Sequence, residues 1–336
     1  MNTFFHGRDL ISLDEWEVGD IRTTIDVAMD FKRRYAQARY ERLLDQKTLF
    51  MMFFEQSTRT RNSLEAGMTQ LGGHAHDLTP SKMQITHGES PRDTAKVLSR
   101  MGEGISIRSC FHGIGNGYLR EIAAHAEIPV ISMQDDIYHP LQGLADLMAI
   151  EEVFGANLQG LKVAVTWAYA TSHAKPLSVP QTQALLFPRF GMDVAIANPP
   201  EFPLQEEILA KAARNAEAGG GSVTVTDAME DAVAGADIVI PKNWGGFAYF
   251  HEFVDDEEHG RIMKENLERH DDWCCTAEVF ARANKHARVM HALPADRGNE
   301  VTDEVLDGPA SIIYDEAENR LHTAKSVLAL LMGGRP

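Results

Sequence analysis

The chain alternates short apolar runs with longer stretches in which apolar residues recur at helical spacing. The clearest run, Leu49–Phe54, has six consecutive apolar residues, which is typical of a strand buried on both faces. After it, Leu64, Met68 and Leu71 recur at the spacing of one helical face, and Gly72-Gly73 follows as a helix stop. The pattern predicts a buried strand that leads directly into a helix.

Similar strand candidates recur along the whole chain. They lie at residues 49–54, 74–78, 104–108 and 129–133, and then at 162–167, 192–197, 222–226, 237–241 and 288–293. Helical stretches separate them, and strand–helix alternation at this spacing is typical of βαβ units in parallel sheets. The glycine-bounded segment 155–160 separates the two series. We therefore predict an α/β fold with two doubly wound parallel-sheet domains and a cleft between them.

The helical pattern and the chain length give the domain bounds. We expect charged helices over residues 9–47 and further helices at 91–101, 140–154, 181–190, 204–217, 227–235, 275–284 and 321–332. A chain of 336 residues favours two domains. We place these domains at residues 1–150 and 151–318, with a C-terminal helical segment, 319–336, that packs on the first domain.

Four hydrogen-bond donors follow the first strand, namely Ser57, Thr58, Arg59 and Thr60. They fall at a helix N-terminus, where unpaired backbone N–H groups and the positive end of the helix dipole favour an anion. Ser57 and Thr58 could instead only cap the helix, with Arg59 as a solvated surface charge, but a cap needs only one such residue. We interpret the turn as an anion site. The chain has no Gly-x-x-x-x-Gly-Lys-Ser/Thr loop, so a small phosphate-bearing molecule fits better than ATP.

Two further strand ends carry candidate binding residues. Arg108 ends the third strand, on the edge where open parallel sheets bind ligands, although a salt-bridged structural arginine is the alternative. The tetrapeptide His139-Pro-Leu-Gln142 follows the fourth strand and opens a long helix. An imidazole and a carboxamide at one helix start can together bind a carbonyl oxygen and an amide-type NH2 group.

Composition limits the partners. Acidic residues outnumber basic ones by 49 to 32, and the net charge of −17 opposes attraction to nucleic acid or to an anionic membrane. The three cysteines include an adjacent pair, Cys274 and Cys275, which favours a reduced, cytoplasmic setting. The N-terminal residues lack the apolar core of a signal peptide, and the histidines show no metal-binding pattern. We expect a cytoplasmic protein with no metal, no nucleic-acid partner and no membrane association.

Five motifs, in order, resemble those of the aspartate and ornithine carbamoyltransferase family over nearly the whole chain. They are Ser57-Thr-Arg-Thr60, Arg108, His139-Pro-Leu-Gln142, His291-x-Leu-Pro294 and Asp315-Glu-Ala-Glu-Asn-Arg-Leu-His322. The stretch from His291 to Lys325 is particularly similar to ornithine carbamoyltransferases. The resemblance implies transfer of the carbamoyl group of carbamoyl phosphate to the amine of an ornithine-type amino acid, with release of phosphate and without a cofactor.

The resemblance also implies which residues bind carbamoyl phosphate. They are Ser57, Thr58, Arg59, Thr60, Gln84, Arg108, His139, Gln142, Leu293 and Arg320. The catalytic residues would be Thr60, Arg108 and His139, at the carbonyl oxygen. Gln142 and the backbone carbonyl of Leu293 would bind the NH2 group. These fixed donors would stabilise the oxyanion that develops when the neutral amine attacks.

In this family the loop that carries Gln84 reaches a neighbouring subunit, so the resemblance implies a homotrimer or a multiple of trimers. The acceptor residues implied are Trp167, Lys242, Trp244, His291, Ala292 and Leu293. Ornithine enzymes carry an Asp at the position of Lys242, and that Asp pairs with the α-ammonium of the substrate. A lysine there should repel a free α-ammonium, unless Lys242 points to solvent and another acid takes over.

Three segments, 166–168, 175–180 and 242–244, resemble instead the knotted branch of the family, which includes acetylornithine and succinylornithine carbamoyltransferases. In that branch a proline-rich loop encloses a later segment, so we expect a knot in the second domain. An N-acylated ornithine, or another amino-acid amine, is therefore an alternative acceptor. Acetylornithine enzymes carry basic residues at the positions of Asp296 and Glu300, and Ala292 replaces the usual Cys of the family.

Two other classes of protein remain as alternatives. An NAD-dependent dehydrogenase also has two parallel α/β domains, and the glycine cluster Gly113-Ile-Gly-Asn-Gly117 would be its best support. The spacing is not Gly-x-Gly-x-x-Gly, however. A non-catalytic phosphate sensor would be favoured by loss of Arg108 or His139, and both residues are present.

Overall fold

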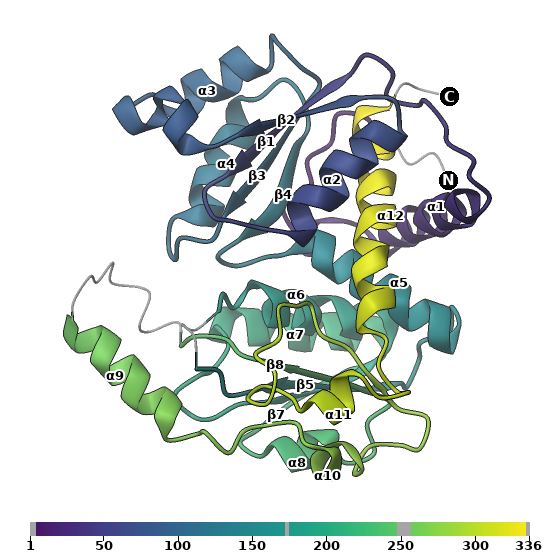
Figure 1. Ribbon diagram of the computed structural model, residues 1–336, viewed down its shortest axis with the longest axis vertical. Helices are drawn as coiled ribbons and strands as arrows, with labels where there is room; N and C mark the ends of the chain where they lie inside the picture. Colours follow the sequence, from purple (N-terminus) through teal and green to yellow (C-terminus); the bar gives the residue numbers. More distant parts are fainter. Residues whose placement is uncertain (1–4, 172–174, 247–256, 334–336) are drawn as a thin grey trace. The chain divides into compact units, whose positions relative to one another are not determined.

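The computed structural model describes residues 5–171, 175–246 and 257–333, and it divides into two compact units. Unit 1 comprises Met1–Met148 together with Ala317–Pro336, and unit 2 comprises Ala149–Glu316. Each unit contains one parallel sheet with helices on its faces (Figure 1). The predicted α/β fold class with two parallel-sheet domains is therefore confirmed.

The sheet of unit 1 has the strand order β2-β1-β3-β4, and all of its pairings are parallel. Its strands are β1 (Thr48–Phe53), β2 (His74–Leu78), β3 (Gly104–Ser109) and β4 (Val130–Asp135). The apolar residues of β1 are buried on both faces of the strand because helices cover both sides of the sheet. This burial is why the run Leu49–Phe53 shows no alternation with polar residues.

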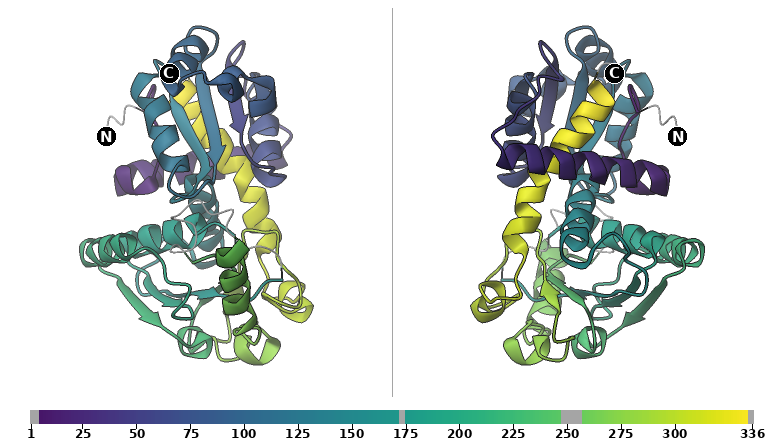
Figure 2. Two further views of the ribbon diagram at one scale, coloured as in Figure 1. Left: turned by 90° about the vertical axis from the view of Figure 1, so that its left-hand side faces the viewer. Right: turned by 90° about the vertical axis from the view of Figure 1, so that its right-hand side faces the viewer.

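The helices of unit 1 fall on the two faces of this sheet. Figure 1 shows α3 (Pro91–Leu98) and α4 (Gly115–His125) on one side, with α2 (Arg59–Gln70) on the other, beside α12 (Ile313–Met332). The long helix α1 (Val18–Ala36) crosses α12 in Figure 2. Two hydrogen bonds join α1 to α12, and they connect the beginning of the chain to its end. Lys32 Nζ donates to Asn319 Oδ1 (2.8 Å), and Ser326 Oγ donates to the Thr24 carbonyl (2.7 Å).

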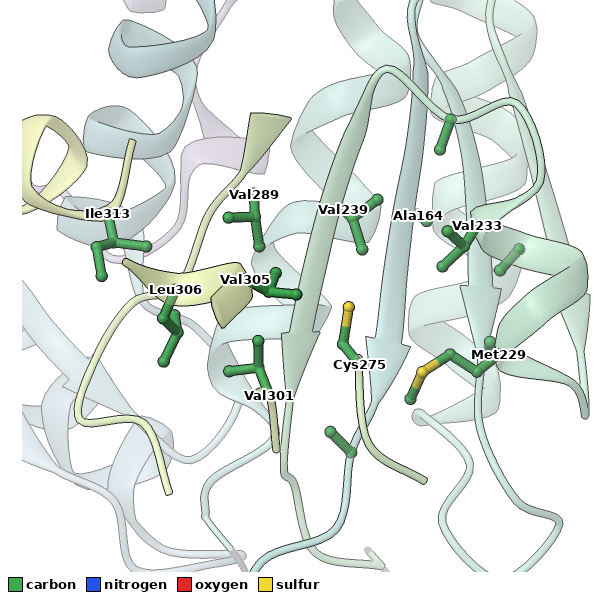
Figure 3. Packing of buried hydrophobic residues seen from close by; sticks show 14 residues of the cluster. Ala164, Met229, Val233, Val239, Cys275, Val289, Val301, Val305, Leu306 and Ile313 are labelled. Atoms are coloured by element: carbon green, nitrogen blue, oxygen red, sulfur yellow. The ribbon is translucent and has the colours of Figure 1, made fainter. Parts of the chain in front are cut away.

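The sheet of unit 2 has the strand order β7-β6-β5-β8-β9, again with parallel pairing throughout. Its strands are β5 (Lys162–Trp167), β6 (Asp193–Ala197), β7 (Ser222–Thr226), β8 (Ile238–Lys242) and β9 (Arg288–Val289). The remaining helices are α5 (Pro140–Phe154), which begins in unit 1, α6 (Ser178–Leu186), α7 (Glu206–Gly219), α8 (Met229–Val233), α9 (Glu257–Glu268), α10 (Ala277–Phe280) and α11 (Asp303–Leu306). Figure 3 shows the apolar core on one face of this sheet, where Val239 and Val289 pack with Cys275, Val301 and Leu306.

Both sheets have a switch point at which the chain order reverses. In unit 1 the chain leaves β1 toward β2 and leaves β3 toward β4, and in unit 2 it leaves β5 toward β6 and β8 toward β9. Loops diverge at such a point and leave a crevice beyond the carboxyl ends of the two central strands, where open α/β sheets bind ligands. Phe53 pairs with Arg108 across the first switch point, and Trp167 pairs with Lys242 across the second. Three of the expected site residues, Arg108, Trp167 and Lys242, therefore lie at the ends of these central strands.

The strand predictions agree with the structure, apart from the last strand, which is only Arg288–Val289. Several helix predictions were wrong. Between residues 9 and 47 the structure has α1 and a 3-10 turn at Leu13–Glu15, and the chain beyond Gln37 is not helical. Ala38 and Gln46 have positive φ angles there, which a helix does not allow. The apolar side chains that recur at helical spacing in this region are buried, namely Leu13, Trp16, Ile21, Ile25, Ala28 and Phe31.

The other helix corrections concern the ends of segments. The helix expected at 275–284 is only Ala277–Phe280, and the last helix begins at Ile313 rather than at 321. The earlier start suits Asp315 and Glu316, because acidic side chains are stabilised in the first turn of a helix. Three helices, α4, α9 and α11, had not been predicted.

The knot stays a prediction. Residues 172–174 of the proline-rich loop lie outside the described residues. Just after them, the Lys175 N–H donates to Asn243 Oδ1 (3.4 Å), and the Lys175 carbonyl accepts from the Gly245 N–H (2.9 Å). The loop therefore contacts the segment that it would enclose.

Candidate functional site

The turn after β1 provides the first part of the candidate site in unit 1. Helix α2 begins at Arg59, so Ser57 to Thr60 lie at the strand-to-helix junction as predicted. Thr58 occupies the N-cap position but makes no side-chain capping hydrogen bond, so the hydroxyl is not used in the way that the capping alternative requires. The neighbouring Arg61 has a structural role, since it pairs with Asp77 and lies over the Phe53 ring.

Arg320 joins this turn to the start of α5. Its side chain is 3% exposed, and its guanidinium donates to Thr60 Oγ1 (2.9 Å) and to Gln142 Oε1 (2.6 Å). Gln142 in turn donates from Nε2 to Asp146 Oδ1 (2.7 Å), one helical turn further along. Three of the sequence motifs therefore meet in one hydrogen-bonded chain.

This chain fixes the orientation of the Gln142 amide. Because Asp146 can only accept from Nε2 when it is ionised, Oε1 must face Arg320. An amide oxygen has two lone pairs, and the bond from Arg320 uses one of them. A ligand NH2 group that binds Gln142 would therefore donate to the same Oε1 atom.

Arg108 is held between two side chains on the same sheet edge. Its Nη1 donates to Gln134 Oε1 on the neighbouring strand β4, and its Nε lies 3.9 Å from Glu55 Oε2. Glu55 also accepts the Cys110 N–H through Oε1 (2.8 Å). Burial raises the pKa of Glu55, while the Cys110 hydrogen bond and the positive charge of Arg108 oppose that rise. Arg108 is thus oriented by a partly desolvated carboxylate beside the loop after β1.

His139 lies on the next loop of the same edge and is almost fully buried. It immediately precedes α5, and its carbonyl accepts the N–H groups of Gln142 (3.0 Å) and Gly143 (3.1 Å). Arg108 lies near the end of β3 and His139 follows β4, so the two residues belong to neighbouring strands. Gln84 is placed differently, on an exposed 3-10 turn (Gln84–His87), where its Oε1 lies 3.1 Å from Nδ1 of His87.

In unit 2 the loops after β5, β8 and β9 converge on one buried carboxylate, Glu300, which is 0% exposed. Its oxygens accept the backbone N–H groups of Asn243 (2.7 Å) and Asp296 (2.5 Å). Lys175 Nζ lies 3.0 Å away and Lys242 Nζ lies 3.8 Å away. Glu300 therefore links the two lysines and the turn after β9 in one charged cluster.

The pKa shifts follow from this arrangement. Burial alone would raise the pKa of Glu300, but His291, Lys242 and Lys175 outweigh it and hold the pKa well below its usual value. Burial lowers the pKa of His291 to about 4, so this imidazole is neutral near pH 7. The alternative in which Lys242 points to solvent is wrong, because Lys242 is buried beside Glu300.

The His291–Leu293 segment has an unusual backbone. Leu293 has a positive φ of 50°, and its N–H donates to Nδ1 of His291 (2.8 Å). That bond leaves the imidazole proton on Nε2, which lies 3.3 Å from Glu300 Oε2. The histidine therefore connects the buried carboxylate to the backbone at Leu293, beside Ala292.

Trp167 and Trp244 are fully buried in unit 2. Trp167 stacks on Phe202 with a centroid distance of 4.7 Å and donates from Nε1 to the Trp244 carbonyl (2.8 Å). Trp244 donates from its own Nε1 to the Phe202 carbonyl (2.9 Å). Both indole N–H groups are thus used inside the unit, and a contact of these residues with an acceptor stays a prediction.

The glycine cluster at residues 113–117 does not form a dinucleotide site. The Asp136 carboxylate accepts the N–H groups of Gly113 (2.7 Å) and Asn116 (2.7 Å) at the start of α4. A carboxylate therefore already occupies the helix N-terminus on which the pyrophosphate of a dinucleotide would have to bind. This geometry argues against the dehydrogenase alternative.

Several residues of the hydrogen-bond and ion-pair networks around Gln142, Arg108 and Glu300 had not been predicted from the sequence. Asp146 could have been found, because residues four apart on a helix lie on the same face as Gln142. Glu55, Gln134, Lys175 and the role of Glu300 carry no such signal, since each acts through contacts between loops that are far apart in the chain.

Two family descriptions match the chain. Residues 8–152 match the carbamoyl-P binding domain of aspartate/ornithine carbamoyltransferases, and residues 164–331 match the Asp/Orn binding domain. The chain belongs to the aspartate/ornithine carbamoyltransferase family. The predicted family and the enzyme class of carbamoyltransferase are confirmed.

Similar proteins come from both branches of the family. An ornithine carbamoyltransferase of Methanoculleus marisnigri is 36% identical over 97% of this chain and 97% of its own length. A putative carbamoyltransferase of Escherichia coli, YgeW, is 34% identical over 94% of this chain and 88% of its own length. Among solved structures, the ornithine carbamoyltransferase of Pyrococcus furiosus has a TM-score of 0.86 at 34% identity and covers 99% of this chain and 100% of its own. An acetylornithine transcarbamylase complexed with acetylcitrulline has a TM-score of 0.87 at 30% identity, with 97% and 100% coverage.

Over the described ranges, the chain has no group of three or more His, Cys, Asp or Glu side chains that could hold a metal ion. None of the helices within those ranges is long and apolar enough to cross a membrane.

Replacing Glu300 by Gln should destabilise unit 2, because the change leaves Lys175 and Lys242 beside a neutral amide in a buried site. Breaking a buried ion pair typically costs about 3–5 kcal/mol of unfolding free energy. The carboxylate, whose pKa is lowered, stabilises the fold above its ordinary pKa of 4.5 and loses this effect as the pH falls further. The difference in unfolding free energy between the wild type and the variant, measured by urea denaturation, should therefore narrow below pH 4.5. The exposed Glu304→Gln is the matched control, and an equal effect of both variants would contradict the role given to Glu300.

Proposed function

We propose that this chain transfers the carbamoyl group of carbamoyl phosphate to the amine of an ornithine-type amino acid and releases phosphate. The observation that carries the proposal is the hydrogen-bonded chain from Thr60 through Arg320 to Gln142, which joins three family motifs within unit 1. The switch point of the same sheet supports it, because the β1 turn and Arg108 both lie there.

The phosphate would bind at the start of α2. The backbone N–H groups of the first helical turn, the hydroxyls of Ser57 and Thr58, and the guanidinium of Arg59 are donors for its oxygens. Arg108 would add a second guanidinium from the neighbouring strand. This local set of cations is what an anionic substrate needs on a chain with a net charge of −17.

Catalysis would depend on charge that develops at the carbonyl oxygen. The amine lone pair attacks the carbonyl carbon, negative charge moves to the oxygen, and Thr60, Arg108 and His139 would stabilise it as fixed donors. The bond from carbon to the phosphate oxygen then breaks, and the leaving phosphate accepts the proton that the amine gives up. Gln142 would orient the carbamoyl NH2 by accepting a hydrogen bond at Oε1, the atom that also binds Arg320. Binding of this NH2 by the Leu293 carbonyl stays a prediction.

The acceptor would bind at the switch point of unit 2, where Lys242 is the last residue of β8. Lys242 would repel a free α-ammonium less than an unpaired lysine would, because the Glu300 carboxylate lies 3.8 Å from its ammonium nitrogen. Both lysines, Lys175 and Lys242, lie beside the single carboxylate of Glu300. A lysine at this position still cannot pair with an α-ammonium as an aspartate would, because its side chain is a hydrogen-bond donor. An N-acylated ornithine, or another amino acid whose α-amine is not bound as a cation, is therefore the second candidate acceptor.

The assembly and the location of the protein are also part of the proposal. We propose a cytoplasmic homotrimer in which the exposed turn that carries Gln84 reaches the carbamoyl phosphate site of a neighbouring subunit. The turn supports this because it is exposed and the Gln84 side chain bonds to His87 of the same turn.

The proposed reaction has a direct test. Wild-type protein, incubated with carbamoyl phosphate and a panel of amino-acid amines, should release phosphate and give a product heavier than one of the amines by a carbamoyl group. Arg108→Ala should lower kcat by on the order of 10³-fold, since one oxyanion donor typically contributes several kcal/mol. Its melting temperature should change little. The exposed Arg100→Ala, at a side chain that is 75% exposed, is the control. Equal rates for Arg108→Ala and wild type would refute the role of Arg108.

The acceptor preference can be shifted by a paired substitution. Lys242→Asp alone would place two carboxylates together in a buried site, so Lys242→Asp should be combined with Glu300→Gln. The double variant should raise the ratio of kcat/KM for ornithine to kcat/KM for Nα-acetylornithine by about tenfold, which corresponds to about 1.4 kcal/mol. Glu300→Gln and Lys242→Met alone are the controls. If the double variant ranks the two amines as the wild type does, Lys242 does not select the acceptor.

Shared sites in a trimer can be detected by mixing subunits. Light scattering should give the mass of three 37.3-kDa chains. Arg108→Ala subunits and Gln84→Ala subunits, each impaired alone, should recover activity after they are unfolded together and refolded, because some sites then combine an intact Arg108 with an intact Gln84 from a neighbour. A mixture no more active than its two components would count against the shared site.

A further inference from the structure

The connection from β4 to α5 is built around one buried carboxylate, Asp135. It is 0% exposed and is the last residue of β4. Its Oδ1 accepts the N–H groups of Ile137 (2.9 Å) and Tyr138 (2.7 Å), and its Oδ2 accepts Ser132 Oγ (2.8 Å). Its own N–H donates to the Tyr138 carbonyl (2.9 Å). Residues 135–138 are therefore closed into a ring of hydrogen bonds on a single side chain.

This ring fixes the residue that follows it, which is His139. Tyr138 is bound to Asp135 through both its N–H and its carbonyl, so the backbone that enters His139 has a set direction. On the other side, the His139 carbonyl begins the hydrogen bonds of α5. The N–H groups that Asp135 binds precede α5, so the carboxylate is not a cap of that helix. It holds the turn that delivers the imidazole.

The neighbouring carboxylate extends the arrangement to the next loop. Asp136 accepts the N–H groups of Gly113 and Asn116, which follow the strand that carries Arg108. Arg108 lies near the end of β3, and His139 lies in the connection after β4. Asp136 binds the connection after β3, and Asp135 binds the connection after β4. Burial, with a smaller contribution from Asp136, raises the pKa of Asp135 to about 7 against the opposing effect of its hydrogen bonds, so the turn is held at a cost in desolvation.

We propose that Asp135 is a positioning residue for His139: its two oxygens hold the β4–α5 turn in the one conformation that aims the imidazole at the substrate carbonyl. The inference rests on the proposed function, in which His139 acts on carbamoyl phosphate. Asp135 itself does not contact the substrate. A misplacement of about 1 Å in a catalytic group can lower a rate by about 10²-fold, so the turn has kinetic consequences.

Two substitutions of Asp135 test whether the hydrogen bonds that hold the turn are needed for turnover. Asp135→Asn keeps an oxygen that can accept both N–H groups, and its NH2 can donate to Ser132 Oγ. Asp135→Ala removes every acceptor. We expect kcat to fall by about 10²-fold in Asp135→Ala, with KM for carbamoyl phosphate changed by less than about threefold, and to stay within about threefold of wild type in Asp135→Asn.

The matched control is Asp237→Ala in unit 2, which also removes a buried carboxylate that accepts a backbone N–H, from Lys162. It should lower the melting temperature but keep kcat. Nuclear magnetic resonance of protein labelled with 15N-histidine gives a readout that does not depend on turnover. The His139 signals, assigned with His139→Ala, should move in Asp135→Ala and stay in place in Asp135→Asn and in Asp237→Ala.

Unchanged His139 signals and kcat in Asp135→Ala would overturn the proposal, and so would equal losses in Asp135→Ala and Asp135→Asn. If Asp135→Ala does not fold, Asp135→Ser carries the test, because its single short acceptor should give an intermediate kcat and an intermediate shift. Absence of any carbamoyl transfer by the wild type would refute the proposed function alone, and the His139 signals would still decide the role of Asp135.

Discussion

The guanidinium of Arg320 is the interaction on which the site in unit 1 depends. A buried guanidinium must have its donors satisfied, and this one binds Thr60 and Gln142, two residues that are 82 positions apart in a chain that only returns to them at its end. The helix that carries it, α12, is held against α1 by the bonds from Lys32 and Ser326. The site therefore requires the last helix to be in place, even though most of its residues come from the first 150.

Unit 2 likewise contains a buried charged side chain with several partners, but this one is negative. Glu300 is a buried anion, and it is tolerated because two lysines and two backbone N–H groups surround it. These partners come from the loops after β5, β8 and β9, which lie side by side in the sheet. One carboxylate thus sets the relative position of three loops at the switch point. A change at any one partner will alter the others.

The sheets and most of the unit 1 site could be predicted from the sequence, because both leave local signals. Buried strands such as Leu49–Phe53 are continuous apolar runs, and the donors at Ser57–Thr60 stand together at a helix start. The helix predicted over residues 37–47 was wrong, although the composition of this charged stretch suits a helix. Ala38 and Gln46 adopt positive φ angles there, which the tertiary fold imposes. Asp135 and Glu300 could not have been found, since their partners are assigned only when turns and loops close around them.

The acceptor question shows why the charge of a site cannot be read from one residue. Lys242 by itself suggested repulsion of an α-ammonium, but its effect depends on Glu300, which lies 3.8 Å from its ammonium nitrogen. An ion pair in a buried site has a weaker field at a third group than either charge alone, because the two contributions oppose each other. The charge of Lys242 alone is therefore a poor guide to which acceptor the site would take. The electrostatics of this part of unit 2 are set by the whole Glu300 cluster, to which His291, neutral near pH 7, adds a donor without adding charge.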